Sequence, residues 1–134
     1  MLTHAAGYVA TLATFLIIDA IWISVFMRPI FERNLGEFLL DSPRLGAAAT
    51  FYALYIAGVL YFAVGPALSS GSVRTVVFNG AFLGFLAYGT YEATNMATLR
   101  GWTYGMVVID VAWGMFLTAL SAVVGFLCYR WMAG

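Results

Sequence analysis

The sequence predicts an all-α integral membrane protein: a bundle of four transmembrane helices joined by short loops. Of its 134 residues, 63% are hydrophobic and only 9% are charged, and the mean hydropathy is +0.94. About a quarter of the residues in a soluble domain are charged, so this surface must face lipid. Four segments also reach the ~20 apolar residues that cross ~30 Å of hydrocarbon. The length predicts a single transmembrane domain over 1–134.

The four predicted helices span residues 5–27, 46–68, 75–99 and 104–131. The first has no basic region before its apolar run, so we interpret it as a membrane helix and not as a removed signal peptide. Only residues 100–103 separate the last two segments, which predicts a tight antiparallel hairpin. Gly80 and Gly84 form a small-residue stripe that lets the third helix approach a neighbour closely.

The first loop, residues 28–44, has two interpretations. Apolar residues recur among its charges at roughly helical spacing, which indicates a short amphipathic helix in the membrane interface, whereas an ordinary solvated loop explains the composition equally well. This loop and residues 100–103 together contain four of the six arginines. The arginine distribution therefore favours a cytoplasmic position for both loops.

Three carboxylates fall inside the predicted spans: Asp19, Glu92 and Asp110. A charged side chain in hydrocarbon is costly and normally faces the interior of a bundle, where it marks a functional site. Each acid lies six to eight residues from the helix end next to the first or third loop. At 1.5 Å per residue, all three are expected about 9–12 Å below one membrane face.

Polar and aromatic residues recur beside these acids. Tyr88 and Asn95 share a helix face with Glu92, and the pattern Ile-Asp-x-x-Trp occurs twice, ending at Trp22 and at Trp113. The candidate ligand- or proton-binding residues are Asp19, Glu92, Asp110, Asn95, Tyr88, Trp22 and Trp113. The alternative is that each acid is a protonated, hydrogen-bonded packing residue. We interpret Trp102, Tyr104, Tyr129 and Trp131 as interfacial belt residues.

The rest of the composition excludes several classes. One cysteine, Cys128, excludes an intramolecular disulfide, and one histidine, His4, excludes a bis-histidine haem or a multi-histidine metal site on this chain. The formal net charge of zero gives no basic surface for nucleic acid. The sequence therefore predicts neither a cofactor nor a metal.

The stretch Tyr91-Glu92-Ala93-Thr94-Asn95, followed by Asp110-x-x-Trp113-Gly114, resembles the signature of a bacterial family of small four-helix inner-membrane proteins catalogued as a domain of unknown function. The similarity extends over almost the whole chain. Members often carry aspartate at the position of Glu92, which implies that a carboxylate is required there. The resemblance implies a multi-pass protein of the bacterial inner membrane and brings no activity with it.

Three functions suit these features. The first is binding or transport of a small cation or amphipathic compound, with proton coupling through the carboxylates and with a homodimer forming the pathway. The second is a membrane enzyme acting on a lipid or isoprenoid, in which paired acids serve as general acid and base and Mg²⁺ or Ca²⁺ is the candidate metal. The third is an accessory subunit of a larger membrane complex.

Overall fold

The computed structural model describes residues 1–39, 42 and 44–134, and these residues form helices and no strand. The all-helical prediction is therefore confirmed. The elements are α1 (Leu2–Trp22), a π turn (Ile23–Met27), α2 (Arg28–Leu35), a 3-10 turn (Gly36–Phe38), α3 (Leu45–Val59), a second π turn (Leu60–Val64), α4 (Gly65–Ser70), α5 (Val73–Thr98) and α6 (Tyr104–Ala133). Because the π turns join their flanking helices end to end, the described residues make four long helical segments.

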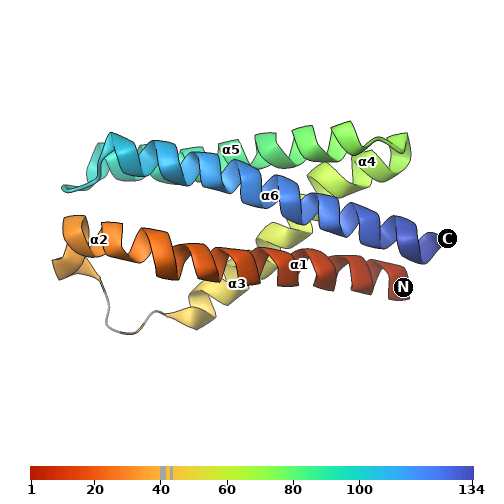
Figure 1. Cartoon of the computed structure of the whole chain (residues 1–134), viewed down its shortest axis with the longest axis horizontal. Helices are drawn as coiled ribbons and strands as arrows, with labels where there is room; N and C mark the ends of the chain where they lie inside the picture. The colour runs from red at the N-terminus through yellow and green to blue at the C-terminus, as the bar shows by residue number, and fades with distance from the viewer. Residues whose placement is uncertain (40–41, 43) are drawn as a thin grey trace.

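The segments run up and down, so both termini lie at one end of the bundle (Figure 1). The most extensive helix contact joins α5 to α6, and the next joins α1 to α6. The helix α3 runs obliquely past α1, and α4 then returns to α5 (Figure 1). The first residues of α3 are exposed. This oblique course separates α3 from α1 at the end where α2 lies.

Three segments of the described chain are long and apolar enough to cross a membrane: 2–38, 45–70 and 104–133. The segment α5 is 26 residues long but is not among them. Its sequence contains Arg74, Asn79, Glu92 and Asn95, which lower its hydropathy. Among the long helices α1, α3, α5 and α6, α5 is therefore the most polar, and it packs most extensively against a neighbour, α6.

The first loop is helical over residues 28–38, as the amphipathic-helix alternative predicts, and the ordinary solvated loop is not seen there. The helix α2 follows α1 directly through the π turn (Figure 1). Pro29 lies in the first turn of α2, where its missing N–H is tolerated. The apolar residue Leu35 packs on Trp102 and Met106. The amphipathic pattern therefore reflects protein packing at this position. Leu40, Asp41 and Pro43, at the end of this loop, lie outside the described residues.

The second π turn has an identifiable cause. Pro66 has no N–H, so the Phe62 carbonyl four residues earlier lacks its usual helical donor. The Asn79 side chain of α5 donates a hydrogen bond to that carbonyl, with Nδ2 3.1 Å from the oxygen. This polar side chain thereby links the bend to α5.

The α5–α6 hairpin is held together by close backbone contact. A Cβ atom added at Gly84 would overlap the Gly114 carbonyl, and one added at Gly80 would lie 2.9 Å from the Ala119 Cα. Both glycines are buried. The structure thus shows the close approach that the glycine stripe predicts, and this approach places the acid of α5 beside that of α6.

Candidate functional site

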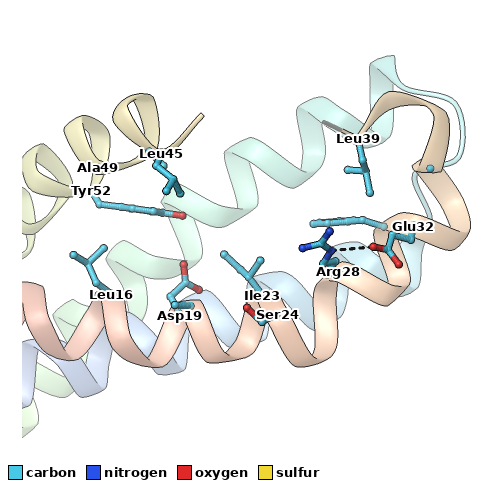
Figure 2. Close-up of a pocket in the computed structure, with 14 residues that line it drawn as sticks. Leu16, Asp19, Ile23, Ser24, Arg28, Glu32, Leu39, Leu45, Ala49 and Tyr52 are labelled. Carbon is cyan, nitrogen blue, oxygen red and sulfur yellow. Dashed lines mark hydrogen bonds and ion pairs between the residues drawn. The ribbon is translucent and has the colours of Figure 1, made fainter. Parts of the chain in front are cut away.

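A half-open groove lies between α1, α2 and α3 and extends to α5 and α6. It consists of two cavities, one of about 660 Å³ and one of about 600 Å³. Both cavities are lined by Asp19, Ile23, Phe31, Ala48 and Tyr52. The first is drawn in Figure 2, where the Arg28–Glu32 ion pair lies toward α2 and Asp19 lies deeper along α1. We call the two cavities together the groove.

Asp19 is the carboxylate that the two cavities share. It is 4% exposed, and its Oδ1 accepts a hydrogen bond from Trp113 Nε1 at 3.1 Å. Its carboxylate points into the cavity, and the Tyr52 hydroxyl of α3 points toward it (Figure 2). Tyr52 lies in the predicted second helix, 46–68, but was not among the candidate site residues. Its depth along the helix could have identified it, because Tyr52 lies seven residues inside α3, about 10 Å along the helix.

The two Ile-Asp-x-x-Trp motifs meet in space. Because α1 and α6 are antiparallel, Trp22 stacks face to face on Trp113, with ring centroids 4.2 Å apart and planes 6° apart. Trp113 donates to Asp19 of the opposite motif, but the corresponding N–H of Trp22 is buried without a partner. The two motifs are therefore not equivalent: Asp19 accepts from the tryptophan of the other motif, whereas Asp110 lies beside Glu92.

Asp110 lies beside Glu92, close enough for their side chains to form a hydrogen bond. Glu92 is fully buried, and Asp110 is 9% exposed and lines the second cavity. Glu92 lines neither cavity. The structure therefore brings all three predicted acids into one region but gives them different access: Asp19 and Asp110 face the groove, and Glu92 lies behind Asp110.

Trp102 is a buried residue and not the interfacial belt residue that the sequence analysis predicts. It is 8% exposed, and its Nε1 donates a hydrogen bond of 2.6 Å to Glu92 Oε2. Gly101, with φ +82°, turns the chain so closely against Asn34 that a Cβ atom would overlap the Asn34 carbonyl, and this turn directs the indole inward. The sequence feature that could have identified Trp102 is its position directly after a glycine in a four-residue turn. Such a short turn returns the chain toward Glu92.

Tyr129 also differs from a belt residue, whereas the other two agree with that interpretation. The Tyr129 ring is buried against Gly7, and its hydroxyl lies 3.2 Å from His4 Nδ1. It thus joins the two ends of the chain. Tyr104 and Trp131 are 76% and 82% exposed, as a lipid-facing position requires.

The two remaining predicted residues have unequal positions. Tyr88 lines the second cavity and packs so closely on Gly114 that a Cβ atom there would overlap its ring. Asn95 is half-buried on the face of α5 that carries Glu92, but it lines neither cavity. Tyr88 therefore belongs to the wall of the groove, and Asn95 does not.

The chemistry of the second cavity is acidic and aromatic, whereas the first also contains the Arg28–Glu32 ion pair. No group of three or more His, Cys, Asp or Glu side chains in the described part of the chain is placed to hold a metal ion. The lining of the second cavity combines two carboxylates with aromatic rings and contains no basic residue among those described. Buried carboxylates beside aromatic faces attract organic cations.

The sequence was compared with known proteins. Residues 4–127 match a family described as "Predicted membrane protein (DUF2177)". Comparison with curated proteins and with solved structures finds no match. The matched residues include every residue that lines the groove, as well as Glu92. The chain therefore belongs to this family of membrane proteins of unknown function.

Proposed function

We propose that the protein binds a small amphipathic cation in the groove and carries it across the membrane in exchange for a proton. The observation that supports this most strongly is the position of Asp19, whose carboxylate lines both cavities and faces the Tyr52 hydroxyl. Its donor from α6 is an indole N–H, which carries no compensating charge. An ionised carboxylate in such a site needs a counter-charge, which a cation supplies.

The walls of the second cavity suit the rest of such a ligand. Aromatic faces attract an organic cation through their quadrupoles, and the apolar remainder of the ligand gains burial. The aromatic lining residues are Phe15, Phe31, Phe51, Tyr52, Tyr55, Tyr88 and Tyr91. The groove is half-open, so two copies of the chain facing each other would complete the pathway that transport requires.

Proton exchange follows from the same electrostatics. When the cation leaves, Asp19 remains in a largely apolar groove, where the charged form is costly. Uptake of a proton removes that cost, and binding of the next cation displaces the proton. Alternating occupancy of one carboxylate is thus sufficient to couple the two movements.

Binding of tetraphenylphosphonium to the purified full-length chain in detergent micelles tests the proposal. Calorimetry is expected to show that Asp19→Asn raises the Kd at least about tenfold, because a desolvated charge contact contributes about 2 kcal/mol or more. The matched control is Glu37→Gln, which removes an exposed acid outside the groove. Unchanged binding in Asp19→Asn, or equal weakening by both substitutions, would contradict the proposal.

An enzyme acting on a lipid or isoprenoid is the second candidate, because the groove is long, apolar and bordered by the Arg28–Glu32 pair. General acid–base chemistry requires two carboxyls that reach the substrate. Asp19 and Asp110 meet this condition, whereas Glu92 lines neither cavity. A changed lipid profile in a deletion strain, with no cation binding by the pure protein, would favour the enzyme.

An accessory subunit would instead co-purify with a partner chain.

A further inference from the structure

We propose that Glu92 and Asp110 form a proton-binding site of their own, in which one proton is held between the two carboxyl groups and Trp102 positions Glu92. The role of this site in transport rests on the proposed function, but the proton-binding site itself does not. It differs from the cation position at Asp19 because Glu92 lines neither cavity, while Asp110 connects the pair to the second cavity, which Asp19 also lines.

The hydrogen bonds of Glu92 carry the argument. The side chain is fully buried, and Oε2 accepts the Trp102 indole N–H at 2.6 Å. The other oxygen, Oε1, is buried without a donor. Asp110 lies beside Glu92 within hydrogen-bonding reach, but two ionised carboxylates offer only acceptors. One O–H between the two groups satisfies the unpartnered oxygen and removes a negative charge at the same time.

Among the described residues that line the cavity beside Asp110, none is basic. The other acid nearby, Asp19 of α1, lines the second cavity together with Asp110. The remaining titratable groups of that cavity are phenols, contributed by Tyr52 and Tyr55 of α3 and by Tyr88 and Tyr91 of α5. Two adjacent negative charges in a buried site repel each other strongly, so a proton is the available means of neutralising one of them.

The site has one open side and one closed side. Asp110 lines the second cavity, so a proton reaches or leaves the pair through the groove. On the other side, Trp102 covers Glu92 and packs with Leu35 and Met106, which keeps water from the α5–α6 turn away. The pair thus communicates with the groove that contains Asp19, and not with the nearer end of the bundle.

Infrared spectroscopy of the full-length protein in micelles at neutral pH, with no ligand added, tests the inference. The C=O absorption of the pair's protonated carboxyl is expected in the wild type, and it is expected to persist in Asp19→Asn, which removes only the contribution of the Asp19 carboxyl. It is expected to be lost or shifted in both Glu92→Gln and Asp110→Asn, because an amide N–H then replaces the carboxyl proton. Circular dichroism and gel filtration establish that each variant is folded, and the two substitutions report on the pair independently.

Trp102→Phe tests the positioning role. It removes the indole N–H from Glu92 Oε2 while keeping an aromatic ring, so the absorption is expected to shift in frequency and to persist. A wild type without any protonated-carboxyl absorption would overturn the inference, as would an absorption that neither Glu92→Gln nor Asp110→Asn alters. Since no cation is present, failure of tetraphenylphosphonium binding would leave this result intact and would contradict only the proposed transport.

Discussion

Gly84→Ala is expected to reduce the free energy of unfolding by about 1–3 kcal/mol, the usual cost of an overpacked contact. The added Cβ would overlap the Gly114 carbonyl, so α5 and α6 would have to move apart. The hairpin carries Glu92 on α5 and Asp110 on α6. The substitution should therefore disturb the carboxyl pair as well as the packing. Reversible unfolding in mixed detergent micelles measures the effect.

Gly89→Ala is the matched control for this prediction. Gly89 lies in the same helix, but a Cβ atom there would meet nothing within 4 Å. Alanine favours a helix over glycine by about 1 kcal/mol, so Gly89→Ala is expected to be neutral or stabilising. If both substitutions changed stability in the same direction and by the same amount, helix propensity alone would explain them, and the close α5–α6 contact would be refuted.

Trp102→Ala is expected to cost about 3–5 kcal/mol of stability, the range for truncating a large buried aromatic residue. The indole fills the cluster with Leu35 and Met106 and donates to Glu92, so its removal leaves both a void and a buried carboxyl without its donor. Trp131→Ala removes a side chain that is 82% exposed and should change stability by about 0.5 kcal/mol or less. The same micelle unfolding assay compares the two variants. Equal losses of stability in the two variants would contradict the buried position of Trp102 and would favour its interpretation as an interfacial belt residue.

Composition and the lengths of the apolar runs were sufficient to predict the four helical segments. That the three acids lie in one region of the bundle was also predictable, since their levels follow from residue counts along each helix. Which side chains meet was less predictable. These helices are apolar almost all round, so hydrophobic periodicity does not define the face that each turns to its neighbours.

The pairing of Glu92 with Asp110, with Asp19 placed against Trp113, therefore depends on helix rotations that the sequence does not specify. The groove is a second case. It results from the oblique course of α3, which no residue pattern in 46–68 indicates (Figure 1). The inward position of Trp102 depends on the contact of Gly101 with α2, and this contact becomes visible only once residues 28–38 are known to continue α1.

In the proposed mechanism, Asp19 is a carboxylate that a cation reaches within the membrane. Labelling with the lipid-soluble reagent dicyclohexylcarbodiimide, with the modified residue located by mass spectrometry, measures whether Asp19 is accessible in this way. We expect that Asp19 is modified, that tetraphenylphosphonium slows this modification, and that Glu92 reacts more slowly because Trp102 and Asp110 enclose it. Modification of Glu92 with Asp19 left unreacted, or modification of Asp19 that the cation does not slow, would show that Asp19 is not the cation site.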